Sequence, residues 1–263
     1  MTVLVGGVGQ LYQGDLDLGR RAAERLQAED LGRDVLVEDF HYGAVAVAQR
    51  LEDLRPDALV LVGAEARGRP PGSVERRRIR DLDLEPARVQ EAVADAGTGS
   101  VTIDLLLEVS SGLGVLPART VAIEVEPART GPTPELSPEA LQGLQRALGL
   151  VRAEVQRAPV LRLADEARGV LAERGQRLEP SAALEALQAL LAELERVDDQ
   201  GRWGRTFAER DRLRLRIGSG GTGEGMDHLD WGLWWGLIEE LDRLQATEAP
   251  PVEPSPPTPA SGG

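Results

Sequence analysis

Residues 2–29 read TVLVGGVGQLYQGDLDLGRRAAERLQAE, and this stretch decides the fold. Apolar residues at 2–5 lead into a turn that contains Gly7 and Gly9, and an acidic loop follows. A helix then begins near Gly19, with apolar residues through Leu26 on one face. Strand, loop and helix in this order form the first half of a βαβ unit, so we expect a parallel sheet.

The loop after this first strand carries two carboxylates, Asp15 and Asp17. In an open parallel sheet, ligands bind where strands end and helices begin. The loop lacks both the G-x-G-x-x-G pattern and a Gly-Lys-Ser/Thr sequence. Its chemistry therefore favours a cation, or a backbone amide held by hydrogen bonds, over a pyrophosphate.

The alternation of strands and helices continues to about residue 157. Continuous apolar runs are typical of parallel strands that are covered on both faces. The expected strands are 2–5, 34–38, 58–62, 73–79 and 120–125, and the expected later helices are 44–54, 86–97, 98–112 and 138–156. We predict an α/β fold with a three-layer, doubly wound, mostly parallel sheet. The basic run at 73–79, SVERRRI, is expected at an edge with its arginines exposed.

Beyond residue 157 the sequence changes character. Amphipathic helices are expected at 163–174, 182–197, 205–217 and 227–244. All four tryptophans lie after residue 200, and the helix that contains Trp234 either packs its aromatic face internally or docks a partner. We predict an α/β domain at 1–157, a helical extension at 158–246, and a disordered Pro/Ser-rich tail at 247–263.

Four segments of the α/β region resemble the hydrogenase maturation proteases. They are VGGVGQLYQGDLDLGRRAAERL (5–26), LVEDFHYGAVAVAQRL (36–51), DALVLVGAEARGRPPGSV (57–74) and RTVAIEVEPARTGPTPELSPEALQGL (119–144). The resemblance implies a phosphorylase/hydrolase-like fold. It also implies an endopeptidase that removes the C-terminal extension of a nickel-iron hydrogenase large subunit, with nickel already loaded in that substrate.

The resemblance also suggests where the site residues lie. Asp15 and Asp17 become the candidate catalytic side chains, as in an aspartic-type endopeptidase. Gly7, Gly9, Gly19 and Gly43 become the positions where a bound group approaches the backbone. Asp17, His41 and Glu65 follow three different strands, and their oxygen and nitrogen atoms make a candidate ligand set for nickel or zinc.

Each of these candidates has an ordinary structural alternative. The two aspartates can form a solvated loop in which Asp15 caps the following helix, and His41 can be a surface histidine beside Tyr42. At the family's metal-ligand positions this chain has Leu16, Gly63 and the segment 98–100. The alternative function is therefore a catalytically inactive relative that binds a hydrogenase subunit as an assembly factor.

Composition narrows the possible partners and compartments. The net charge of −14 and a pI near 4.7 argue against nucleic acid and anionic membranes as partners. The absence of cysteine excludes disulfides and a Cys nucleophile. No run approaches the roughly 20 apolar residues of a membrane span, so we expect a cytoplasmic protein. The oligomeric state stays open.

Overall fold

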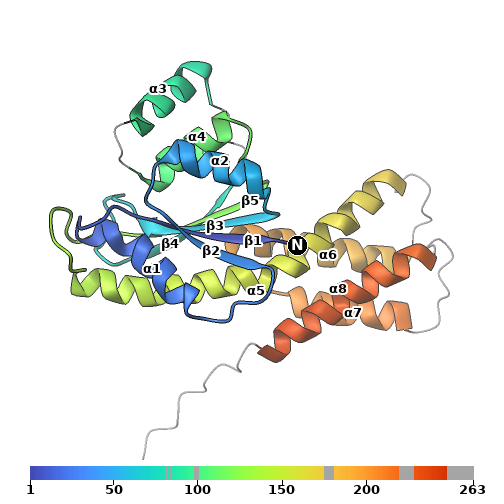
Figure 1. Cartoon of the computed structure of the whole chain (residues 1–263). Coiled ribbons are helices and arrows are strands. Elements are labelled where there is room, and N and C mark those ends of the chain that lie inside the picture. The colour runs from blue at the N-terminus through green and yellow to red at the C-terminus, as the bar shows by residue number, and fades with distance from the viewer. Residues whose placement is uncertain (81, 83, 98–100, 175–180, 219–227, 248–263) are drawn as a thin grey trace, which may run out of the picture. The chain divides into compact units, whose positions relative to one another are not determined.

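The computed structural model describes residues 1–247 apart from 81, 83, 98–100, 175–180 and 219–227 (Figure 1). Its five-stranded sheet has the order β2-β1-β3-β5-β4. The strands are β1 (Val3–Val8), β2 (Val35–Phe40), β3 (Ala58–Ala64), β4 (Val74–Ile79) and β5 (Arg119–Val125). Only β4 runs antiparallel to its neighbour in this sheet. The predicted, mostly parallel sheet is confirmed.

Helices cover both faces of the sheet and complete three layers (Figure 1). One apolar core lies between the sheet, α1 (Leu18–Gln27) and the first part of α5 (Pro138–Arg174). A second core lies between the sheet, α2 (Ala44–Leu54) and α4 (Ile103–Gly112), with α3 (Pro86–Ala96) packed on the outside. Odd residues of β1 face the first core and Leu4 and Val8 face the second, which explains the continuous apolar run.

Glycines bring α1 unusually close to β1. A Cβ atom on Gly19 would lie 2.0 Å from the carbonyl oxygen of Val8, and one on Gly7 would lie 2.2 Å from the carbonyl oxygen of Gly19. A Cβ atom on Gly6 would meet the ring of Phe40 at 2.1 Å. Close packing of β1 against α1 therefore accounts for Gly7 and Gly19, and the Phe40 ring of β2 accounts for Gly6.

The arginines of β4 differ from the exposed basic edge that the sequence predicted. The strand lies at the edge of the sheet, but the side chains of Arg76 and Arg78 are only 7% and 9% exposed. Arg76 binds the carboxylate of Glu154 and the carbonyl oxygens of Asp198 and Asp199. These arginines are buried because their charges are paired, and they do not serve as solvated charges along an open edge.

The chain divides into two compact units, and the division differs from the predicted domain boundaries. The first unit contains Met1–Leu161 together with Leu194–Trp203, and the second contains Arg162–Glu193 and the chain from Gly204. Asp198 explains why the distant segment joins the first unit, because its carboxylate pairs with Arg78 at 3.0 Å and Arg119 at 2.6 Å. No local sequence pattern indicates these partners.

Most helices of the C-terminal part are longer than expected. Helix α5 is continuous through Pro159, although two separate helices were predicted there. The remaining helices are α6 (Ala182–Gln200), α7 (Thr206–Gly218) and α8 (His228–Thr247). Trp234 is 1% exposed, which supports internal packing for that residue. The side chains of His228 and Trp231 and the predicted disordered tail beyond residue 247 lie outside the described residues.

None of the helices described in the structure is long and apolar enough to cross a membrane.

Candidate active site

The carboxyl ends of the parallel strands gather ionisable side chains from several loops. The first is Asp15, in the short 3-10 turn Asp15–Asp17 that follows β1. It is fully buried, and its carboxylate accepts hydrogen bonds from the backbone N–H groups of Ala128, Arg129 and Ser137 and from the Ser137 hydroxyl, at 2.7–2.9 Å. Asp15 therefore fastens the β1 loop to the segment that leads into α5, and does not cap α1.

Asp17 pairs with arginines of α1, the helix that it precedes. Its carboxylate accepts hydrogen bonds from Nε and Nη2 of Arg20, at 2.6 and 2.5 Å, and lies 3.3 Å from Nε of Arg21. The hydrogen bond with Asp17 raises the pKa of the Arg20 guanidinium above its ordinary value. Because the Asp17 side chain is only 1% exposed and both oxygens are occupied, it is a poor metal ligand here.

His41 pairs with Asp39 at the end of β2. Nδ1 of His41 lies 3.0 Å from Oδ2 of Asp39, and the His41 side chain is 42% exposed. The ring of Tyr42 stands nearly perpendicular to the imidazole, with centroids 5.9 Å apart. Burial raises the pKa of the Asp39 carboxyl, against the opposing attraction of His41 and Arg20. The His41 imidazole is therefore held by the Asp39 carboxylate on one side and exposed to solvent on the other.

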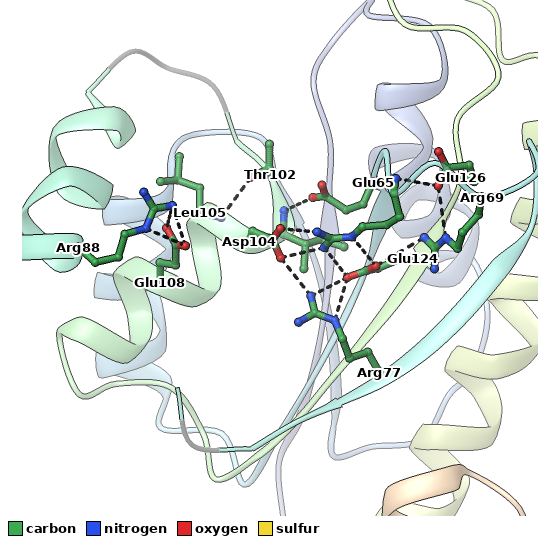
Figure 2. Close-up of polar contacts among 12 residues, drawn as sticks. Glu65, Arg69, Arg77, Arg88, Thr102, Asp104, Leu105, Glu108, Glu124 and Glu126 are labelled. Atoms are coloured by element: carbon green, nitrogen blue, oxygen red, sulfur yellow. Dashed lines mark hydrogen bonds and ion pairs between the residues drawn. The ribbon is translucent and has the colours of Figure 1, made fainter. Parts of the chain in front are cut away.

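Glu65 follows β3 and points to the start of α4 (Figure 2). Its Oε1 accepts a hydrogen bond from the backbone N–H of Ile103 at 2.5 Å. Burial raises the pKa of Glu65 to about 7, although the Ile103 N–H favours the ionised form. Repulsion by Asp104 raises this pKa further. A carboxyl group in this state can take up or release a proton near neutral pH.

Next to Glu65 lies an ion-pair network that the sequence analysis missed. Arg67 binds both oxygens of Asp104, at 2.6 and 2.8 Å, and also binds Glu124 at 2.9–3.0 Å. Figure 2 labels the two carboxylates, Asp104 and Glu124. Arg77 binds Glu124 as well, at 2.6 Å. Burial raises the pKa of Glu124, but hydrogen bonds from Arg67 and Arg77 bring it below its ordinary value. A carboxylate inside the apolar run TVAIEV was the available signal for a buried, paired charge.

The structure does not assemble the predicted nickel set. No group of three or more His, Asp or Glu side chains able to hold a metal ion occurs among the described residues. Asp17 binds Arg20, and His41 pairs with Asp39. Glu65 accepts a hydrogen bond from a backbone N–H at the N-terminus of α4. The arrangement of Asp17, His41 and Glu65, as the structure describes it, therefore does not fit a nickel ion.

The glycines that were predicted to let a bound group approach the backbone have structural roles. Gly7 and Gly19 are required by the packing of α1, as described above. A Cβ atom on Gly9 would lie 3.1 Å from the carbonyl oxygen of Leu16. Gly43 has a φ of 103° and open space around its missing side chain, so it is a turn residue beside His41. A Cβ atom on Gly63 would lie 2.7 Å from the Val8 carbonyl oxygen, which leaves little room for a ligand side chain there.

Gln10 connects the glycine turn to the neighbourhood of Glu65. Its Nε2 donates to the carbonyl oxygen of Val101 at 3.4 Å, and Ile103 binds Glu65 two residues further on. The turn after β1 and the carboxyl group after β3 thus hold the same short segment before α4.

Among solved structures, this chain is similar to several hydrogenase maturation peptidases. It is 28% identical to a hydrogenase 2 maturation peptidase from Thaumarchaeota archaeon SCGC_AB-539-E09, with a TM-score of 0.43 over 57% of this chain and 96% of that one. It is 24% identical to an endopeptidase from Escherichia coli, with a TM-score of 0.46 over 60% and 93% of the two chains. It is 20% identical to the hydrogenase maturating endopeptidase HybD from E. coli, with a TM-score of 0.43 over 60% of this chain and 94% of that one. No family model and no curated protein sequence matches this chain.

Proposed function

We propose that this chain is an endopeptidase of the hydrogenase maturation protease kind, which removes the C-terminal extension of a nickel-iron hydrogenase large subunit. The sequence resemblance supports this proposal, because its four segments contribute residues to all five strands of a single α/β unit in chain order. The observation that carries it is the placement of Glu65, a largely buried carboxyl group fixed by the Ile103 N–H beside the turn of β1.

Hydrolysis of a peptide bond needs a group that removes a proton from water as the water oxygen attacks the carbonyl carbon. Glu65 suits this role because its pKa of about 7 gives both protonation states at neutral pH. The Ile103 N–H orients the carboxyl group, and Arg67 holds the neighbouring Asp104 and Glu124. We assign Glu65 as the general base and Asp15 and Asp17 as residues that position the β1 loop.

Nickel enters this proposal as part of the substrate. The resemblance implies a large subunit that arrives with its metal loaded, so no step of the reaction is assigned to an ion held by this chain. The proposed substrate is an intracellular precursor, and we place the protein in the cytoplasm together with it.

The test is incubation of the purified full-length protein with nickel-loaded precursor, followed by mass spectrometry of the large subunit. We expect a shortened product, and we expect Glu65→Gln to slow its formation by about 10²–10⁴-fold, as removal of a general base does. Glu91→Gln is the matched control, because Glu91 is an exposed carboxylate on α3.

Two results would contradict the proposal in different ways. Undiminished cleavage by Glu65→Gln would remove Glu65 from the site. Tight binding of the precursor without any cleavage by the unaltered protein would instead support the inactive assembly factor.

A further inference from the structure

We infer that His41, oriented by Asp39, is a second proton-transfer group of this edge, and that its Nε2 donates a proton to the amine that leaves when the peptide bond breaks. This inference rests on the proposed endopeptidase function. Four observations carry it: the geometry of the pair, a buried oxygen atom without a partner, the exposure of the imidazole, and the position of the pair relative to Glu65.

In this pair, the backbone of Asp39 is fixed in the sheet and the side chain of His41 is accessible to solvent. Asp39 belongs to β2 and lies opposite Gly7 in the sheet, so its backbone is fixed by the pairing with β1. His41 lies just beyond the strand, with Nδ1 3.0 Å from Oδ2 of Asp39 and with 42% of its side chain exposed. A carboxylate at Nδ1 holds the proton on that nitrogen and leaves Nε2 to exchange protons with another molecule.

The second carboxylate oxygen of Asp39 distinguishes this pair from an ordinary surface ion pair. Oδ1 of Asp39 is buried and has no hydrogen-bond partner among the described residues. An unsatisfied buried oxygen costs free energy, about 1–3 kcal/mol, and such atoms call for a physical reason. Because Oδ1 is enclosed by the protein, it anchors the carboxyl group, and Oδ2 is the Asp39 oxygen that faces the imidazole.

The other charged groups around the pair are already partnered. Arg20 and Asp17, at the start of α1, bind one another. Glu38 and Arg50 form a pair near Tyr42. None of these groups takes the place of His41 on Oδ2 of Asp39.

The sheet places His41 and Glu65 on either side of the β1 turn. Asp39 in β2 and Val62 in β3 both lie level with Gly7 of β1. Two strand spacings separate β2 from β3, which is about 10 Å. Asp39 lies near Arg20 of α1 whereas Glu65 binds the start of α4, so the two groups flank the edge from different sides. An extended segment that crosses the turn could reach both.

With both groups, the hydrolysis balances. Ionised Glu65 takes one proton from water while the water oxygen forms a bond to the scissile carbonyl carbon. The C–N bond of the tetrahedral intermediate then breaks, its electron pair stays on nitrogen, and nitrogen takes the proton from Nε2 of the protonated His41. The products are a carboxylic acid and an amine. The proton on Glu65 returns through solvent to neutral His41, which restores both groups.

The experiment measures single-turnover cleavage of nickel-loaded precursor by the full-length protein and by variants at His41. We expect about 10²-fold slower cleavage by His41→Ala, with unchanged binding of the precursor. Free imidazole should restore a large part of the rate to His41→Ala. His41→Gln can still hydrogen-bond Asp39 but cannot transfer a proton, so it should be as slow as His41→Ala. Gln49→Ala, an exposed change on α2, is the control for nonspecific effects.

Asp39 is a positioning residue and is tested by spectroscopy. Nitrogen NMR of the imidazole should show the proton of neutral His41 on Nδ1, and Asp39→Asn should shift it toward Nε2. Cleavage at the normal rate by His41→Ala, or a loss of rate that imidazole does not restore, would overturn the inference while the endopeptidase function stands. If the unaltered protein does not cleave, the proposed function fails, and a proton found on Nε2 in the NMR spectrum would separately overturn the pairing.

Discussion

At the scale of single residues, three carboxylates at one edge of the sheet have three different states. Asp15 is saturated by four donors, Asp17 is paired with a guanidinium, and Glu65 has one backbone N–H and a raised pKa. The partners come from segments far away in the chain, such as Ser137 for Asp15. A carboxylate becomes available for proton transfer when burial exceeds the compensation that its partners supply.

Glu65 should make stability depend on pH. Its pKa is about 7 in the folded protein against an ordinary 4.5, so the folded state binds more protons between these values. Stability should therefore fall as the pH rises from about 4.5 to about 7, by up to about 3 kcal/mol. Glu65→Gln should lack this loss and be more stable than the unaltered protein at pH 8. Denaturant unfolding at pH 5 and pH 8 measures the difference, and equal curves for both proteins would refute it.

Asp15 should contribute stability that exposed aspartates do not. Asp15→Ala leaves the N–H and hydroxyl of Ser137 buried without their acceptor, and it also removes the acceptor of the Ala128 and Arg129 N–H groups. We expect a loss of about 3–5 kcal/mol in the free energy of unfolding, measured by denaturant titration. Asp53→Ala, on the exposed side of α2, should change it by less than about 0.5 kcal/mol. Similar losses for the two variants would mean that the four hydrogen bonds contribute little.

At the scale of elements, the close contact of β1 with α1 sets the path of the loop between them. Gly7 and Gly19 allow the strand and helix backbones to touch. The loop then turns sharply enough for Asp15 to reach the segment before α5 and for Gln10 to reach the segment before α4. The glycines thus act on the site through the placement of neighbouring side chains.

A methyl group at Gly19 should separate helix from strand. Its Cβ atom would lie 2.0 Å from a backbone oxygen that cannot move aside. We expect Gly19→Ala to destabilise the protein by about 3 kcal/mol or more, as severe overpacking does. Gly149→Ala is the matched helical control, because open space surrounds Gly149 in α5. That change should stabilise the protein by about 0.5–1 kcal/mol. Calorimetric melting compares the two, and equal melting temperatures would exclude the close contact.

At the scale of the whole molecule, buried ion pairs join distant parts of the chain into one unit. Arg76, Arg78 and Arg119 project from β4 and β5 and bind Asp198 and the backbone around it. A strand that reads as a solvated basic edge is thereby incorporated into a packed unit. Removal of one partner from such a buried pair is costly because the other charge remains uncompensated.

The two neighbouring aspartates of this segment give a direct comparison. Asp198→Ala leaves Arg78 and Arg119 without their carboxylate and should cost about 3–5 kcal/mol of stability. Among the described residues, the Asp199 side chain pairs only with Arg80, and both side chains are more than half exposed. Asp199→Ala should therefore cost less than about 1 kcal/mol. Denaturant unfolding distinguishes the two, and an equally small effect of both would show that Asp198 does not hold this unit together.

The sequence by itself determined the α/β class, the order of strands and helices, and the edge of the sheet where the candidate site lies. These properties follow from local periodicity and from the positions of glycine and proline, and both signals lie within short stretches of the sequence. Only the tertiary structure decided which carboxylates are saturated, which one has a raised pKa, and which arginines are buried. Ser137 lies 122 residues from Asp15, and Asp198 lies 120 residues from Arg78. Pairings over such distances depend on the packing of whole elements, and no local pattern encodes them.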